Sequence, residues 1–129
     1  EKILVVNVHL EQTNDPARKK QTAVLLDFIQ QYPQYPLVLT GDFNTQSTSD
    51  VYKTIAEQLS DASEIAEVAE KSYTFIGRKT TIDFIFVRDQ MLDVLNYRVI
   101  TGTENGMVPS DHFPIIMEYK LTKTESKEG

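Results

Sequence analysis

Two apolar runs separated by a helical segment constrain the fold of this chain more than any other feature of its sequence. Residues 3–9, ILVVNVH, and residues 37–40 are apolar and rich in β-branched side chains, which is typical of buried strands. Between them, from about residue 15 to residue 31, apolar residues recur at helical spacing. These segments predict a strand, a helix and a second strand, in that order.

The rest of the sequence adds one more helix and a series of strands. We expect the first helix to have Asp15 as its N-cap and Pro16 at its first helical position, and a second helix to cover residues 50–59. Residues 61–71 fit either a short helix or a loop. This order favours an α+β (mixed α/β) fold with helices on one face of a mixed sheet. The further strands are predicted at residues 72–76, 80–87, 95–101 and 113–121.

Length and composition suit one domain, which we expect at residues 1–121, followed by a disordered polar tail at 122–129. With 13 basic and 19 acidic residues, the net charge of -6 argues against a broad basic surface for nucleic acid. A local basic patch or a metal ion can still offset this charge. The absence of cysteine excludes disulfides and cysteine catalysis, and no apolar stretch has the length of a membrane span. None of these features indicates a cellular compartment.

Ionisable and amide side chains gather in four short stretches, each of which ends or interrupts an apolar run. Both histidines of the chain are among them. If the stretches converge, they form an acid-rich and oxygen-rich site, which suits Mg²⁺ or a similar hard cation better than zinc. The residues are Asn7 and His9 in NVHL, Asp42 and Asn44 in GDFN, Asp83 in TIDFIFV, and Asp111 and His112 in SDHFPI.

Each stretch also has a purely structural interpretation. Asp42 and Asn44 point to the same side of an extended chain, but both residue types also form local turns. SDH fits an ordinary loop, and a histidine at the end of a strand is often structural. Asp83 needs a partner inside its apolar run, because an unpaired buried carboxylate is costly, and a structural ion pair would meet that need. Convergence of all four stretches favours metal-assisted hydrolysis of a phosphate ester instead.

The four stretches, in this order and at about these spacings, resemble the motifs of the endonuclease/exonuclease/phosphatase superfamily. Its members include pancreatic deoxyribonuclease and the inositol polyphosphate 5-phosphatases. The resemblance runs from about Ile3 to Leu121. It implies a deoxyribonuclease I-like four-layer α/β/β/α sandwich, of which this chain would supply the C-terminal half, since family members are usually much longer.

The resemblance also implies catalytic roles for the matching residues. Asp42 resembles the acid that orients or deprotonates the attacking water and helps to bind the metal. Asn44 resembles the amide that binds the scissile phosphate. His112 resembles the essential histidine, which acts as a base or as a phosphate-stabilising cation, and Asp83 resembles its carboxylate partner.

Two further residues match at the edge of the motifs. Asp111 resembles the aspartate close to the metal, which would be Mg²⁺ or Mn²⁺. His9 resembles a second histidine, which contacts substrate and protonates the leaving group in some members. Asn7 is expected to be structural, and Arg18 to occupy a surface position on the first helix rather than to approach a phosphate.

The chain departs from the family in its length. The metal-binding glutamate of the family comes from the N-terminal half, and neither Glu11 nor Glu64 lies in its motif. We therefore expect the parent protein to hydrolyse phosphate esters and this chain alone to be nearly inactive. We also expect its uncovered sheet face to bind the missing half or a second copy. A non-catalytic binding module is the alternative, and the substrate stays open between nucleic acid and small phosphate esters.

Overall fold

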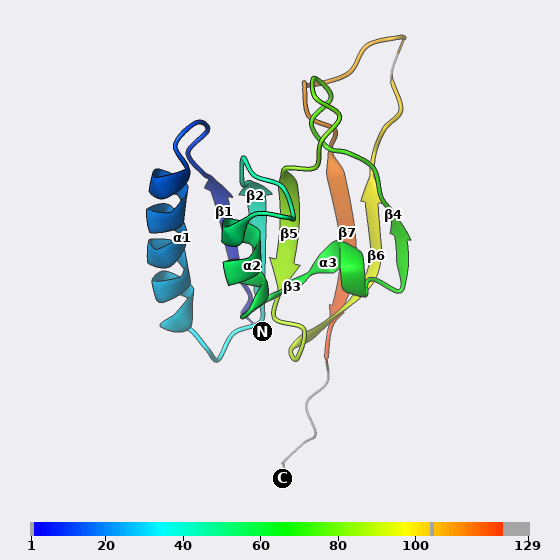
Figure 1. Cartoon of the computed structure of the whole chain (residues 1–129). Helices are drawn as coiled ribbons and strands as arrows, with labels where there is room; N and C mark the ends of the chain where they lie inside the picture. Colours follow the sequence, from blue (N-terminus) through cyan, green and yellow to red (C-terminus); the bar gives the residue numbers. More distant parts are fainter. Residues whose placement is uncertain (1, 104, 123–129) are drawn as a thin grey trace.

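A computed structural model describes residues 2–103 and 105–122, in which three helices accompany two sheets (Figure 1). The helices are α1 (Asp15–Gln30), α2 (Asp50–Ala56) and α3 (Ala62–Ile65). Four strands form the first sheet, namely β1 (Leu4–His9), β2 (Leu37–Asp42), β5 (Asp83–Val87) and β3 (Ser60–Asp61). Three form the second, namely β4 (Val68–Glu70), β6 (Leu92–Val99) and β7 (Ile115–Leu121).

The four-stranded sheet combines one parallel pair with antiparallel neighbours. Strands β1 and β2 are parallel, as the connection through α1 requires, and β5 runs antiparallel to β2 and to β3. The end of β2 therefore lies beside the start of β5. In this register Asp42 pairs with both His9 and Asp83, so three polar residues meet at one edge of the sheet.

Helices α1 and α2 cover one face of this sheet. Leu39 and Phe86 are fully buried beneath them, and Phe43 packs edge-to-face on Phe86 with ring centroids 5.5 Å apart. Burial of this apolar surface stabilises the end of β2, from which the GDFN segment emerges. The same core cluster contains Leu25, Leu26 and Ile29 of α1 and Val51 and Ile55 of α2.

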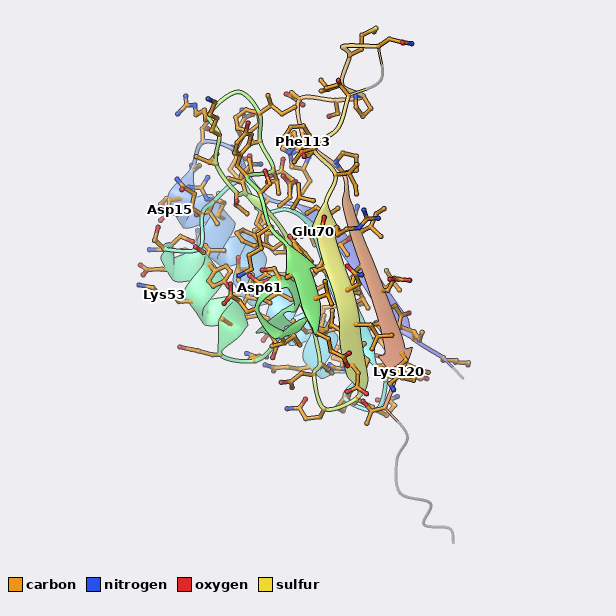
Figure 2. All side chains as sticks on the ribbon, turned by 90° about the vertical axis from the view of Figure 1, so that its right-hand side faces the viewer. Asp15, Lys53, Asp61, Glu70, Phe113 and Lys120 are labelled. Atoms are coloured by element: carbon orange, nitrogen blue, oxygen red, sulfur yellow. The ribbon has the colours of Figure 1, made fainter. Side chains whose placement is uncertain are left out.

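The second sheet packs against the opposite face of β2 and β5. Val38 and Val87, which face away from α1 and α2, join a second cluster with Val94 and Tyr97 of β6. In the side view of Figure 2 the helices lie toward the labelled Asp15 and Lys53, and β7 lies on the other side. A single mixed sheet was predicted, and the strands form two sheets instead, because β6 and β7 pair with each other and with β4 rather than with β5.

Strand β1 has one covered face and one open face. Leu4, Val6 and Val8 pack on the core cluster, whereas the alternate residues are exposed, with Val5 at 64%. This alternation follows from the period-two geometry of a strand. His9 lies on the open face, so that it reaches the edge of the sheet where Asp42 ends β2.

Several predicted boundaries need correction. Asn14, not Asp15, caps α1, because its side chain accepts a hydrogen bond from the N–H of Ala17 at 2.9 Å. Ser49 caps α2, which ends at Ala56. Segment 61–71, which fitted either a short helix or a loop, contains α3, the whole of β4 and the second residue of β3. The predicted tail falls almost entirely at residues 123–129, outside the described residues.

The predicted strand at 72–76 is wrong. This segment is irregular, and Phe75 makes isolated bridges to Thr80 and His112. The buried hydroxyl of Thr74 accepts hydrogen bonds from the N–H groups of Ile82 and Asp83, which takes the place of a strand ladder. The apolar pattern did not reveal this side-chain-to-backbone pairing.

Arg88 ties the end of β5 to the end of α1, which has no basic residue in its last turn. Its guanidinium donates to the carbonyl oxygens of Ile29, Tyr32 and Tyr35 at 2.6–2.7 Å. We expect Arg88→Met to lower the free energy of unfolding by about 2 kcal/mol, because three carbonyls lose charged donors. Urea unfolding measures this loss. Arg88→Lys should lose less, and equal stability of Arg88→Met and the wild type would contradict this account.

Candidate active site

The ends of three neighbouring strands place the catalytic candidates together. His9 ends β1, Asp42 ends β2 and Asp83 begins β5, and the strand register sets Asp42 opposite both of the others. Because the underlying core fixes these strands, the polar side chains are held by rigid elements rather than by a loose loop.

A tight turn after β2 orients Asp42. The backbone N–H of Asn44 donates to Asp42 Oδ1 at 2.9 Å, and Asn44 adopts φ 51°, a left-handed conformation that asparagine tolerates. The Asn44 side chain donates from Nδ2 to the carbonyl oxygen of Leu10 at 2.8 Å. One carboxylate oxygen of Asp42 is thereby fixed, while Oδ2 faces the two imidazoles.

His112 is held by its backbone and by its ring. The N–H of Ile76 donates to the carbonyl oxygen of Asp111 at 2.9 Å, and Phe75 bridges to His112, which fixes the SDH loop beside β5. The His112 ring packs on Phe75 with centroids 5.1 Å apart, and its Nδ1 lies 2.7 Å from Asp83 Oδ2. Asp83 therefore orients the imidazole and leaves Nε2 directed toward Asp42.

Asp42 lies between the two histidines. Its Oδ2 is 3.6 Å from Nε2 of His112 and 3.6 Å from Nε2 of His9. These distances are too long for direct hydrogen bonds, so a water molecule or a substrate oxygen has room to bridge them.

Burial and charge shift two pKa values in the cluster. Burial is the main cause that raises the pKa of Asp42, and the charge of Asp83 adds to it, although the Asn44 hydrogen bond and both histidines oppose the shift. For His112, burial alone would lower the pKa. The hydrogen bond and charge of Asp83, with the charges of Asp42 and Asp111, outweigh this effect, so the net pKa is raised. The cluster favours a charged imidazole next to carboxylates.

The other predicted residues lie at the rim or outside. The His9 side chain is 74% exposed and that of Asp111 is 77% exposed, with Oδ1 of Asp111 3.9 Å from His112 Nε2. Asn7 accepts a hydrogen bond from the Thr40 hydroxyl at 2.8 Å, which fits its expected structural part. Arg18 donates to the carbonyl oxygens of residues 11 and 12 and so ties the loop after β1 to α1.

The donor atoms in the cluster fit a hard cation. One ligand atom each from Asp42, Asp83 and His112 lie within 4.8 Å of one another. The 2.7 Å hydrogen bond already occupies His112 Nδ1 and one oxygen of Asp83, whereas Asp42 Oδ2 has no such bond to any described residue. A carboxylate oxygen at a partly exposed site is the kind of ligand that Mg²⁺ and Mn²⁺ prefer, with water completing the shell.

Replacement of Asp83 should change the titration of His112. We expect Asp83→Asn to lower the pKa of His112 in the metal-free protein, because the variant removes the negative charge that stabilises the imidazolium. A proton NMR titration, with the imidazole signals assigned in His9→Gln, measures the change. Asp89→Asn, in the exposed turn at the far end of β5, is the control. An unchanged His112 titration in Asp83→Asn would contradict the pairing.

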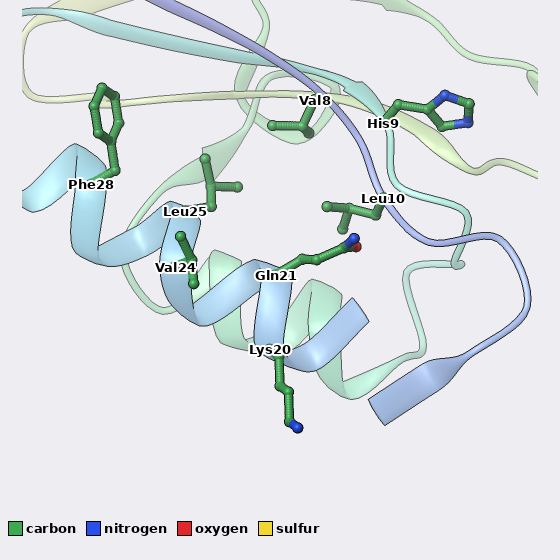
Figure 3. Close-up of a pocket in the computed structure, with 8 residues that line it drawn as sticks. All are labelled: Val8, His9, Leu10, Lys20, Gln21, Val24, Leu25 and Phe28. Carbon is green, nitrogen blue, oxygen red and sulfur yellow. The ribbon is translucent and has the colours of Figure 1, made fainter. Parts of the chain in front are cut away.

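An apolar groove between α1 and β1 lies next to the cluster but is chemically distinct from it. It measures about 580 Å³, and Figure 3 shows the His9 ring directed away from Val24 and Phe28. Its other lining residues are Val8, Leu10, Lys20, Gln21 and Leu25. The groove offers no carboxylate, so the polar cluster rather than the groove defines the candidate active site.

The sequence did not predict the groups that hold the candidate catalytic residues in place. Thr74 and Phe75 were interpreted as part of a strand, and Leu10 acts through its carbonyl oxygen, which no side-chain pattern reveals. The requirement for glycine at position 41 was also missed. The glycine immediately before an acid at the end of a strand was the available signal, since glycine inside a strand often marks a close backbone approach.

Comparison with known proteins decides the family. A profile described as the Endonuclease/Exonuclease/phosphatase family matches residues 2–112. The chain belongs to the endonuclease/exonuclease/phosphatase family. Its mixed α+β fold, expected from the resemblance, is thereby confirmed. A comparison with curated protein sequences finds no match.

Solved structures of this family resemble the chain closely. A functionally unknown conserved protein from Enterococcus faecalis has a TM-score of 0.84 at 29% identity, with 93% of this chain and 50% of that chain covered. The mannosyl-6-phosphatase Bt3783 of Bacteroides thetaiotaomicron has a TM-score of 0.83 at 26% identity, with 92% and 51% covered. The human Nocturnin catalytic domain, solved with a bound sulfate anion, has a TM-score of 0.77 at 26% identity. The match covers 92% of this chain and 47% of that chain.

The chain thus spans about half the length of these structures. The family's description names endonucleases, exonucleases and phosphatases, and one of these solved structures is a mannosyl-6-phosphatase. None of the helices in the described part of the chain has the length and hydrophobicity needed to cross a bilayer. The assignment of residues 1–121 to a C-terminal half stays a prediction.

Proposed function

We propose that the protein hydrolyses phosphate esters with the help of a divalent metal ion, and that the cluster around Asp42 carries out the reaction. The observation that carries this proposal is the placement of Asp42 Oδ2, 3.6 Å from an imidazole that Asp83 orients from its other side at 2.7 Å. A free carboxylate oxygen next to an oriented imidazole supplies acid–base chemistry at one position. Membership in the family supports the phosphate ester as the substrate class.

Asp42 and His112 have different roles in the attack of water on phosphorus. Asp42 orients the attacking water and accepts its proton, and its raised pKa makes it a stronger base than an exposed aspartate. His112 donates from Nε2 to a phosphoryl oxygen, where negative charge grows as the water attacks. Asp83 acts on His112 alone, since it holds Nδ1 and favours the protonated ring.

Asn44 and His9 position the substrate on either side of Asp42. One N–H of the Asn44 amide is used by the Leu10 carbonyl oxygen, which leaves the second N–H for a phosphoryl oxygen. His9 is exposed at the rim, where it contacts the substrate and protonates the leaving oxygen. The Asn44 role uses an amide that the fold already orients.

Mg²⁺ or Mn²⁺ fits the cluster through Asp42, with Asp111 as a second carboxylate at the rim. When bound, such an ion supplies charge stabilisation for the phosphoryl oxygens. We propose that a further glutamate ligand comes from outside this chain. The chain alone would then bind the ion weakly and be nearly inactive, and its open sheet face would bind the remaining half or a second copy.

The experiment that tests this function compares the chain with the full-length protein. Hydrolysis of bis-p-nitrophenyl phosphate and p-nitrophenyl phosphate is followed with Mg²⁺, with Mn²⁺ and with a chelator. We expect turnover by the full-length protein that the chelator abolishes and either metal restores, and little turnover by the chain. Turnover that persists in the chelator would contradict metal dependence. Full activity of the chain alone would contradict the need for a second half.

A further inference from the structure

A polar cavity adjoins the proposed catalytic cluster and shares Asn44 with it, but its other lining residues have no part in the chemistry described above. It measures about 610 Å³, within the range of pockets that hold small ligands. Three segments line it, namely the loop after β1, the loop after β2 and the turn that precedes β5. The lining residues are Gln12, Thr13, Asn44, Thr45, Gln46, Phe75, Arg78, Thr80 and Ile82.

Two lining residues connect this cavity to the cluster. Asn44 is bonded to Asp42 and offers its amide to the scissile phosphate, and it also forms part of the cavity wall. Phe75 lines the cavity and packs on the ring of His112. The cavity therefore adjoins the place proposed for the scissile phosphate.

The lining differs in charge from the cluster beside it. Amides and hydroxyls dominate, and these groups both donate and accept hydrogen bonds, as the hydroxyls of a sugar require. Among the described residues that line the cavity, Arg78 is the one cation and none carries a carboxylate. Within residues 2–103 and 105–122, no carboxylate lies within ion-pair distance of Arg78, whose planar guanidinium matches a phosphate in a bidentate geometry.

We propose that this cavity binds the alcohol portion of the substrate, and that this portion is a sugar that carries a second phosphate, bound by Arg78. The inference rests on the proposed function, which places the scissile phosphate at Asp42 and Asn44. A sugar bisphosphate and a short nucleic-acid chain both present a sugar with a neighbouring phosphate. Arg78 is thus a specificity-determining residue that selects substrates with two phosphates over those with one.

The test measures kcat/KM of the full-length protein on matched esters. Glucose 1,6-bisphosphate is compared with glucose 6-phosphate, and a thymidine trinucleotide with the p-nitrophenyl ester of thymidine 5′-phosphate. We expect Arg78→Gln to lower kcat/KM about tenfold more for the substrate with the second phosphate, mainly through KM, and Arg78→Lys to restore part of the loss. Lys79→Gln is the matched control, since it removes the adjacent cation, which does not line the cavity.

Measurements of substrate binding distinguish a wrong assignment of the cavity from a wrong proposed function. Dissociation constants of the same four compounds are measured for Asp42→Asn with and without Arg78→Gln. If the protein binds the compound with the second phosphate more tightly, and Arg78→Gln removes this preference, the role of Arg78 in the cavity is supported even if no ester is hydrolysed. Asp42-dependent hydrolysis without an Arg78-dependent preference in either pair leaves the proposed function standing and overturns the cavity assignment. The pair that shows the preference identifies the source of the second phosphate.

Discussion

Asp42→Asn should lower kcat/KM of the full-length protein for bis-p-nitrophenyl phosphate by roughly 10³-fold. The substitution keeps the size of the side chain and the acceptor for the Asn44 N–H, which bonds to Oδ1 at 2.9 Å. It removes the charge and basicity of Oδ2, the oxygen that faces both imidazoles. Most of the loss should therefore appear in kcat, with the fold intact.

A matched acid separates this effect from a general change of charge. Asp89→Asn also removes one negative charge, but Asp89 is exposed at the end of β5 remote from Asp83. We expect its kcat/KM to stay within about twofold of the wild type. Activity of Asp42→Asn comparable to that of Asp89→Asn, at equal thermal stability and saturating metal, would show that Asp42 is not the base.

Gly41→Ala should be severely destabilising, although it adds a single methyl group. Gly41 adopts φ 151°, and a Cβ at this position would lie 1.9 Å from the carbonyl oxygen of Val8. This atom belongs to the backbone of the neighbouring strand β1, so the clash is relieved only if β1 and β2 separate. We expect the free energy of unfolding to fall by at least about 3 kcal/mol, the upper end of ordinary point substitutions. Urea unfolding measures the change.

Gly102→Ala provides the control for this prediction. A Cβ at Gly102 meets no atom of the described residues within 4 Å, so the free energy of unfolding of Gly102→Ala should change by less than about 0.5 kcal/mol. Equal stability of the two alanine variants would mean that β1 and β2 do not approach as closely at Gly41 as described. Because Gly41 precedes Asp42, a partly folded Gly41→Ala protein should also lose activity.

The regular elements were predictable because their apolar periodicity is local. The first two strands and the first helix follow from side chains that are apolar or recur at helical spacing, as in LVVNVH. The irregular segment around Thr74 was not predictable in this way. Its conformation depends on a hydroxyl that bonds to the backbone eight and nine residues further along the chain, and such pairing leaves no periodic signal.

The sequence predicted which residues form the candidate site better than it predicted how they are oriented and buried. Polar residues at the ends of adjacent strands meet at one edge of a sheet, which explains why Asp42 lies beside Asp83, whereas His112 reaches them from the loop before β7. The sequence did not distinguish these residues from His9 and Asp111, which lie at the same edge but remain largely exposed. Orientation and burial depend on the turn at Asn44 and on the contacts of the SDH loop, which form only in the folded chain.

The most direct test of the account follows the oxygen of the attacking water. The full-length protein is incubated with bis-p-nitrophenyl phosphate and Mg²⁺ in water enriched in oxygen-18, and mass spectrometry locates any label in the products. Attack at phosphorus by a water that Asp42 orients predicts that the label enters p-nitrophenyl phosphate, with no label in p-nitrophenol, and that Asp42→Asn stops the incorporation. Label in p-nitrophenol, or incorporation into the phosphate that Asp42→Asn leaves unchanged, would contradict the central claim.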